Sequence, residues 1–305
     1  MKNVTLISEQ ATDIISTFIN DIKSKYDLNP KTLAEYAGDL KHFVGWYETL
    51  TNEFSDAYQY LKPENISTPI IINYRTEMQK SMKLKANTIN RRLKSLKRFF
   101  SWVKSSELIE INPCASVRLV KSETIISQQM TEKQIADLVA AVNHNGSLRD
   151  QTIVITLIHT GIRTMEICNL LKSDVIIGKR SGILTVRAGK RNKDREVPLN
   201  STCRKYLKRY LATDQCSYLF PSEKTRNRLT ERAIRYMVKK YMAIAKIENL
   251  SAHNLRHHFG YIMAQNTPIH RLAQIMGHDR LDTTMTYLKA TKEDLQKEVE
   301  KIAWE

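Results

Sequence analysis

Cysteine is scarce in this sequence, and its placement indicates neither a covalent nor a metal framework. The four cysteines are Cys114, Cys168, Cys203 and Cys216. No two of them form a C-x-x-C pair, and none is spaced with a histidine as zinc ligands are. We therefore expect no disulfide framework and no structural zinc site, and we expect a reduced compartment.

Long apolar runs are missing as well. The chain has no stretch of about 18 apolar residues, and it does not open on a basic segment followed by an apolar one. Both absences argue against a membrane span and a signal peptide. There is also no internal repeat, no P-loop and no recognisable carboxylate cluster. We expect a soluble, cytoplasmic protein without a membrane partner.

Positive charge, in contrast, is present in excess. The 305 residues carry a formal net charge of +16, and self-repulsion of this size is seldom kept without a polyanion to neutralise it. Nucleic acid is the leading candidate for that partner, and a solvated basic surface is the alternative. The length exceeds that of one typical core and predicts two domains.

The basic residues are concentrated in one stretch. Residues 75–104 hold ten Lys and Arg against the single Glu77, whereas acidic residues outnumber basic ones in residues 1–74. Apolar residues recur at helical spacing, at Ile89, Leu93, Leu96, Phe100 and Val103. Arg91, Lys94 and Arg98 fall together on another face, as expected of a core-anchored helix that lies on phosphates. The predicted DNA-binding residues are Lys83, Lys85, Arg91, Arg92, Lys94, Lys97 and Arg98.

The pattern of helices and breaks divides the chain. Helices are predicted over residues 7–25, 31–50, 66–82 and 87–105, and Asn112-Pro113 ends the last helical pattern. A polar stretch then precedes a capping box, Thr131 to Gln134, that opens a new helix. The rest is predicted to be mostly helical, except for a β-hairpin formed by residues 183–187 and 195–199.

Five residues of the second half share one chemistry. Arg163 lies in the run from His159 to Glu166, and it is followed by His253-x-x-Arg256, Gly277-His278 and then Tyr287. Paired guanidiniums suit the charge that develops on the oxygens of an attacked phosphodiester. Imidazoles that titrate near neutrality suit proton transfer, and the phenol suits nucleophilic attack. Each of these residues alone would more often be structural.

The order and spacing of these residues resemble the tyrosine recombinase (phage integrase) family. The family signature is an Arg, a Lys on a hairpin, His-x-x-Arg, a Gly-His and a terminal Tyr. The resemblance implies that Lys190, which follows Gly189 in the hairpin, is the catalytic lysine, with Lys193 as its competitor. The implied catalytic set is Arg163, Lys190, His253, Arg256, His278 and Tyr287. Glu166 is expected to support it by orienting Arg163 or a neighbouring histidine.

The resemblance also implies the architecture. The expected fold is mostly α in two domains, an N-terminal SAM-like helical bundle and an α+β catalytic domain with a small antiparallel sheet. The expected divisions are a core-DNA-binding domain at residues 1–112, a linker at 113–128, a catalytic domain at 129–290 and a tail helix at 291–305. The apolar stripe of that tail, Leu295, Val299 and Ile302, must be buried either on its own domain or on another protomer, and the resemblance favours another protomer.

The implied function is site-specific recombination of double-stranded DNA through a 3′-phosphotyrosyl intermediate, with no cofactor and no metal. A dimer on each site and a tetramer in synapsis are expected, close to the nucleoid, in a Xer-like resolvase or in a recombinase of a mobile element. A type IB topoisomerase and an inactive DNA-binding regulator are the alternatives. His159, His257, His258 and His270 match no catalytic position and are expected to be core or surface residues.

Overall fold

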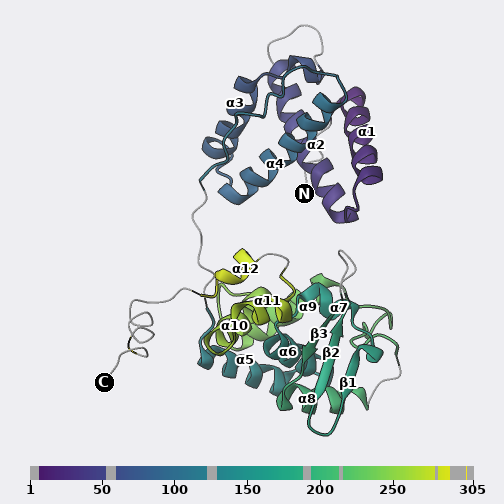
Figure 1. Ribbon diagram of the computed structural model, residues 1–305, viewed down its shortest axis with the longest axis vertical. Helices are drawn as coiled ribbons and strands as arrows, with labels where there is room; N and C mark the ends of the chain where they lie inside the picture. Colours follow the sequence, from purple (N-terminus) through teal and green to yellow (C-terminus); the bar gives the residue numbers. More distant parts are fainter. Residues whose placement is uncertain are drawn as a thin grey trace. The chain divides into compact units, whose positions relative to one another are not determined.

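The computed structural model describes residues 7–52, 60–121, 129–187, 194–212, 216–278, 281–288 and residue 300. The chain forms two compact units, Met1–Ile125 and Ile126–Glu305. The division falls within the predicted 113–128 linker, and the finer domain limits stay a prediction. Figure 1 shows a helical first unit and a second unit that combines helices with a small sheet, as the sequence predicted.

The first unit contains the predicted helices with small shifts at their ends. They are α1 (Glu9–Lys25), α2 (Pro30–Asn52), α3 (Thr68–Lys80) and α4 (Ala86–Ser105), with the 3₁₀ turn η1 (Pro63–Asn65) between α2 and α3. The side chain of Ser8 caps α1 by accepting a hydrogen bond from the Ala11 N–H. Proline begins α2, where its missing N–H and fixed φ are tolerated.

Helix α4 buries the face that its apolar spacing predicted. Ile89, Leu93, Leu96, Phe100 and Val103 all belong to the core of the first unit. Phe99 joins them and packs edge-to-face on Phe18 of α1, with ring centroids 5.4 Å apart. The exposed basic residues Arg91 and Lys94 therefore lie on a helix that is fixed by its buried apolar face.

The second unit is built around one helix. Its helical elements are α5 (Glu132–Asn145), α6 (Leu148–Thr160), α7 (Thr164–Asn169), η2 (Lys172–Asp174), α8 (Ser201–Leu211), α9 (Glu231–Ile244), α10 (Ala252–Asn266), α11 (Ile269–Met276) and α12 (Leu281–Met285). Helix α6 is buried along most of its length, and the hydroxyls of its buried threonines, Thr152, Thr156 and Thr160, donate to carbonyls four residues earlier in the helix. Helix α6 contacts α5, α7, α8 and α10, and its end determines where the candidate site begins.

The sheet has three antiparallel strands in the order β1 (Val175–Ile177), β2 (Gly182–Val186) and β3 (Arg195–Pro198). The predicted hairpin is confirmed, because β2 pairs with β3 from Ile183 opposite Pro198 to Val186 opposite Arg195. Strand β1 was not predicted, since three residues are too few for an alternating pattern. Lys190 and Lys193 lie outside the described residues. In the described part of the chain, no helix is long and apolar enough to cross a membrane.

Candidate active site

Gly161 adopts the left-handed backbone conformation and so positions Arg163 at the candidate site. Helix α6 ends at Thr160, and Gly161 follows with a φ of 62°. A Cβ at this position would also lie 2.2 Å from the ring of Phe259, so both backbone and space require glycine. Arg163 then stands immediately before α7. Its N–H donates to Glu166 Oε2 at 2.7 Å, and its Nη1 donates to Glu166 Oε1 at 3.0 Å.

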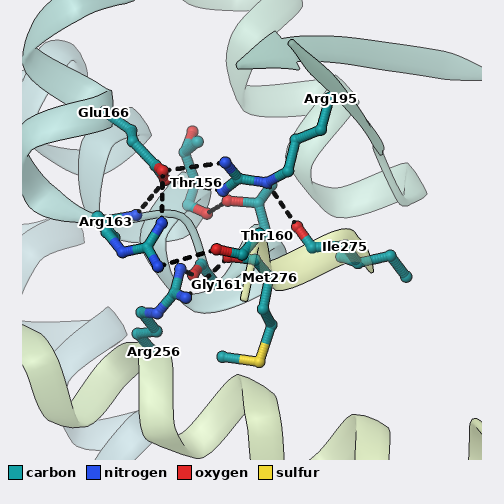
Figure 2. Close-up of polar contacts among 10 residues, drawn as sticks. Thr156, Thr160, Gly161, Arg163, Glu166, Arg195, Arg256, Ile275 and Met276 are labelled. Atoms are coloured by element: carbon teal, nitrogen blue, oxygen red, sulfur yellow. Dashed lines mark hydrogen bonds and ion pairs between the residues drawn. The ribbon is translucent and has the colours of Figure 1, made fainter. Parts of the chain in front are cut away.

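Three arginines converge on the carboxyl end of α11 (Figure 2). Arg195 Nε donates to the carbonyl of Ile275 at 2.9 Å, and Arg256 Nη2 donates to the carbonyl of Met276 at 2.8 Å. Arg163 Nη2 donates to the carbonyl of Gly277 at 2.9 Å. The last carbonyls of a helix lack partners within it and carry its negative dipole end. The end of α11 therefore binds three cations that would otherwise repel one another.

The turn that exposes these carbonyls depends on Gly277. This residue has a φ of 64°, and the N–H of His278 returns to the carbonyl of Ala273 at 3.0 Å. Such a turn is the usual glycine-dependent end of a helix. The turn at Gly277 therefore directs the last carbonyls of α11 toward the arginines, and it places the imidazole of His278 beside Tyr287.

Arg256 is the most enclosed of the three arginines. It is 4% exposed, and its Nη1 donates to the carbonyl of Gly161 at 2.6 Å. Burial, followed by the charge of Arg163, lowers the pKa of the Arg256 guanidinium to about 10, although Glu166 acts in the opposite direction. The group remains charged at neutral pH and forms a rigid, partly desolvated cation.

Three histidines surround this cationic centre. Burial and the neighbouring cations, Arg256 first, lower the pKa of His278 to about 4. Burial, then His253 and Arg256, lower the pKa of His257 to about 4 as well. The pKa of His253 is lowered by burial and then by Arg256. All three imidazoles are therefore neutral at pH 7, and each has a nitrogen able to accept a proton.

Tyr287 lies among these histidines. Its side chain is buried at 7% exposure, and its hydroxyl is 3.1 Å from Nδ1 of His257. His278 stacks on the Tyr287 ring with an interplanar angle of 14°, while its own Nδ1 shares a 2.7 Å hydrogen bond with Thr284. Gly260 lines the slot, because a Cβ there would lie 2.6 Å from Tyr287 Cζ. Burial raises the pKa of the phenol despite the opposing charges of Arg256 and Arg163.

The structure brings most of the predicted catalytic residues together. Arg163, Glu166 and Arg256 meet at the end of α11, and His278 contacts Tyr287. His253 contacts His257, with ring centroids 4.4 Å apart, and His257 in turn contacts Tyr287. Lys190 lies outside the described residues.

Two residues that the sequence did not place in the site, His257 and Arg195, contact Tyr287 and Glu166 there. His257 follows His253 by four residues on one helix face, which was a usable signal. Arg195 begins a strand and gave none. The other histidines have structural surroundings, since His258 is buried and contacts the carbonyl of Met130. His159 contacts the side chain of Asn200.

The predicted DNA-binding residues divide into two groups. Lys83, Lys85, Arg91 and Lys94 are exposed, whereas Arg92, Lys97 and Arg98 are partly buried. Arg92 is 16% exposed and contacts His42 Nε2 at 2.8 Å. Lys97 donates to the carbonyl of Cys114 at 2.9 Å, and the Arg98 guanidinium lies 4.5 Å from the centroid of the Tyr26 ring. Arg92, Lys97 and Arg98 thus contact groups of the first unit itself.

Fold and site together define a class, the enzymes that act on DNA phosphodiesters through a tyrosine. Residues 128–294 match the phage integrase family, and residues 14–110 match the phage integrase N-terminal SAM-like domain. The chain is 29% identical over 288 residues to the tyrosine recombinase XerC of Thermodesulfovibrio yellowstonii, with 90% of each chain covered. It is 31% identical over 219 residues to the tyrosine recombinase XerA of Pyrococcus furiosus, covering 70% of this chain and 73% of the relative.

The fold agrees with a crystal structure of the XerH site-specific recombinase bound to difH substrate. The TM-score is 0.72 at 18% identity, with 100% of this chain and 92% of that chain covered. The chain belongs to the phage integrase family and is a tyrosine recombinase, a DNA strand-transferring enzyme. Family membership favours recombination over the topoisomerase and regulator alternatives.

Proposed function

We propose that this recombinase cleaves DNA with Tyr287 while Arg163 and Arg256 hold the scissile phosphate. The observation that carries the proposal is the convergence of both arginines on the end of α11, directly before the His278 that stacks on Tyr287. The phenol oxygen forms a bond to phosphorus, and the bond from phosphorus to the 5′ oxygen breaks. The phenol proton passes to an imidazole, and Lys190 protonates the departing 5′ oxygen.

Electrostatic stabilisation is assigned to the guanidiniums. Two non-bridging oxygens gain charge in the pentavalent transition state, and planar donors fixed in advance stabilise that charge without reorganising. Arg163 has a side-chain exposure of 46%, so part of its guanidinium is available to a phosphate. His278 donates a further hydrogen bond from its ring. This assignment requires no metal and no other cofactor.

The proton acceptor is assigned to the pair His253 and His257. His253 occupies the position that the resemblance implies, and His257 is the imidazole within hydrogen-bond distance of the phenol. The proposed attack begins from a phenol whose pKa is raised by burial, so the nucleophile in the DNA-free protein is not yet activated. An arriving phosphate adds negative charge beside these imidazoles and makes them better bases.

The proposed partner is a double-stranded recombination site that is bound by a dimer, with a tetramer joining two sites. A hydroxyl of the partner duplex attacks the phosphotyrosine, so that the phosphodiester re-forms and Tyr287 regains its proton. The exposed cations of α4, among them Lys94, supply phosphate contacts on the first unit. Recombination at a Xer-type site or at the ends of a mobile element, in the cytoplasm at the nucleoid, is the biological setting that we propose.

Covalent capture tests the nucleophile. The full-length protein is incubated with randomised nicked duplexes, and complexes that survive SDS are sequenced to recover the site. We expect Tyr287→Phe to abolish capture while the dissociation constant for the recovered duplex stays within about threefold, because a hydroxyl that attacks contributes little affinity. Retained capture would assign the nucleophile to another tyrosine. The same assay in excess EDTA is expected to proceed at an unchanged rate.

Strand exchange separates the two classes of tyrosine enzyme. When a labelled partner duplex is added to the recovered site, a recombinase transfers the strand to the partner. Resealing of the original strand alone, with no exchanged product, would indicate a topoisomerase-like activity instead.

A further inference from the structure

Arg195 takes no part in the chemistry proposed above, yet it contacts the group that holds Arg163. It is the first residue of β3, and its side chain is 13% exposed. Nη1 donates to Glu166 Oε1 at 2.9 Å, and Nη2 donates to Glu166 Oε2 at 2.8 Å. This is the paired, planar geometry that arginine alone can form with a carboxylate.

Glu166 consequently lies between two arginines, as Figure 2 shows. Its Oε1 accepts from both Arg195 and Arg163, and its Oε2 accepts from Arg195 and from the backbone of Arg163. The negative charge of Glu166 is therefore shared between the guanidiniums of Arg195 and Arg163. Without Arg195, the carboxylate would lose two of the four hydrogen bonds that fix it, and it would no longer hold the guanidinium of Arg163 in one orientation for a phosphate.

Arg195 also joins three separate elements. It connects β3 to α7 through Glu166, and it connects both to α11 through the carbonyl of Ile275. Gly277 lies against its guanidinium so closely that a Cβ would be 2.7 Å from Arg195 Cζ. The glycine of the Gly-His pair is therefore required by Arg195 as well as by the turn.

We propose that Arg195 is a positioning residue for strand cleavage, which acts through Glu166 to keep the guanidinium of Arg163 oriented and available for the scissile phosphate. The proposal rests on the function assigned to Arg163 above. Arg195 itself contacts protein groups, so its removal is expected to affect the rate of cleavage much more than the affinity for DNA.

A pH profile distinguishes this role from simple support of the fold. Burial raises the pKa of the Glu166 carboxyl, but the hydrogen bonds and charge of Arg195, followed by those of Arg163, outweigh burial and lower it below its usual value. The charged groups that face this carboxylate are Arg163 beside α7, Arg195 on β3 and Arg256 on α10. Loss of Arg195 raises the pKa of Glu166, and a protonated Glu166 no longer binds Arg163 through charge. The acid limb of the cleavage profile should then move to higher pH.

The experiment measures single-turnover cleavage by the full-length protein on the duplex recovered by capture, together with the dissociation constant and Tm. Arg195→Gln removes the charge, and Arg195→Lys keeps it but cannot form the paired contact. The control is Arg187→Gln, which removes an arginine from the other strand end of the same hairpin, where it pairs with Asp174 at 2.7 Å. A second duplex carries sulfur at the bridging 5′ position, since a thiolate leaves without a proton and needs no general acid.

We expect cleavage to fall about 100-fold in Arg195→Gln and about 10-fold in Arg195→Lys, the loss that misplacing a catalytic group by about 1 Å produces. The dissociation constant should change by less than about threefold, Arg187→Gln should cleave at nearly the wild-type rate, and sulfur should not restore the Arg195 variants. An upward shift of the acid limb completes the expected result.

Several results would overturn the proposal. Wild-type cleavage by a folded Arg195→Gln would do so, as would an equal loss in Arg187→Gln, which would point to general damage of the hairpin. Recovery with the sulfur substrate would show that Arg195 acts on protonation of the leaving group rather than through Arg163. If Arg195→Gln does not fold, full-rate cleavage by Arg195→Lys contradicts the proposal equally. Failure of the proposed function is separate, because wild type would then give no Tyr287-dependent product.

Discussion

At the scale of single residues, the site depends on glycines, which have no Cβ, as well as on the side chains that it contains. Gly161, Gly260 and Gly277 each stand where a Cβ would enter a ring or guanidinium that belongs to the site. The catalytic signature in the sequence names only the reactive side chains. The glycines that make room for Phe259, Tyr287 and Arg195 are equally necessary, because a packed interior accommodates even one extra methyl poorly.

The two histidines near the phenol can be separated by substitution. If His257 accepts the phenol proton, His257→Asn should slow covalent capture by about 10²-fold or more, and His253→Asn should slow it less. The reverse order would assign the proton to His253, as the resemblance implies. Initial rates of capture at saturating duplex give the comparison. His270→Asn, on the exposed part of α11, is the matched control and should behave as wild type.

Stability should depend on pH through the same imidazoles. The pKa values of His257 and His278 are lowered from 6.5 to about 4, so the unfolded chain binds more protons between those limits. The stabilisation of the folded state that comes from keeping these imidazoles neutral is fully present above pH 6.5, and it is lost as the pH falls toward 4. Both groups are partly exposed, and after allowance for solvent screening we expect a loss of about 1 kcal/mol.

Thermal unfolding between neutral and acidic pH measures this effect, and about 1 kcal/mol corresponds to roughly 2–4 °C in Tm for a chain of this size. The double variant His257→Asn, His278→Asn should show a flatter dependence. A variant that is as acid-sensitive as wild type would mean that other groups carry the effect. Bound duplex should also flatten it, since phosphate restores the imidazole pKa values toward normal.

At the scale of elements, helix α4 combines two kinds of arginine that the sequence does not distinguish. Arg91 has a side-chain exposure of 45% and pairs with Asp39 at 2.7 Å, whereas Arg92 faces the interior. Asp39 is itself buried, and burial raises the pKa of its carboxyl against the opposing effect of Ser95 and the two arginines. Removing Arg92 should therefore act mainly on the stability of the first unit.

Removing Arg91, Lys94 and Arg98 together should act on DNA as well as on stability, because Arg91 and Lys94 are exposed while Arg91 also pairs with Asp39 and Arg98 packs on Tyr26. Binding should weaken, and the log–log salt dependence should flatten by up to about 0.9 units per lost phosphate contact. Titrations of duplex at several salt concentrations give the slope. Arg92→Gln serves as the comparison, with a lower Tm and a nearly unchanged slope. An unchanged slope in the triple variant would mean that this face of α4 is solvated and does not contact DNA.

The elements also show where prediction from sequence ends. The buried face of α4, the capping box at Thr131 and the β2–β3 hairpin follow from periodicity and cap residues, and all are found. The end of α11 could not be predicted in the same way. Its function rests on backbone carbonyls, which have no sequence signature, and on Arg195, which reaches Glu166 only after β3 and α7 are packed. Local sequence patterns therefore predict helices and strands, but they do not predict which distant residues form hydrogen bonds after these elements have packed.

At the scale of the whole molecule, a two-unit recombinase needs a control that keeps one protomer from cutting DNA alone. If Tyr287 is the nucleophile, as proposed, the second unit would supply part of that control. Tyr287 is buried, with its hydroxyl bonded to His257 and its phenol pKa raised. We therefore expect cleavage by Tyr287 to require rearrangement around its side chain, for which binding energy from DNA or from another protomer would be the source.

The tail is the sequence feature best suited to supply that coupling. Residues 291–305 lie outside the described structure apart from residue 300, and the prediction rests on the stripe of Leu295, Val299 and Ile302, which has to be buried somewhere. We expect deletion of residues 291–305 to leave binding of a monomer to a single half-site nearly unchanged. Cooperative occupation of paired half-sites should be lost, because the apolar stripe would otherwise cover a neighbouring protomer.

Gel-shift titrations on one half-site and on paired half-sites measure the two effects separately. The variant Leu295→Ser, Val299→Ser is a second test, since it removes two residues of the apolar stripe and keeps the chain length. Loss of cooperativity in both variants, with single-site affinity and Tm preserved, supports contact between protomers. If the truncated protein assembles paired complexes normally, the tail does not couple protomers. If its Tm falls together with its affinity for a single half-site, the stripe packs on its own domain, and the control of cleavage must then lie in the Tyr287 slot itself.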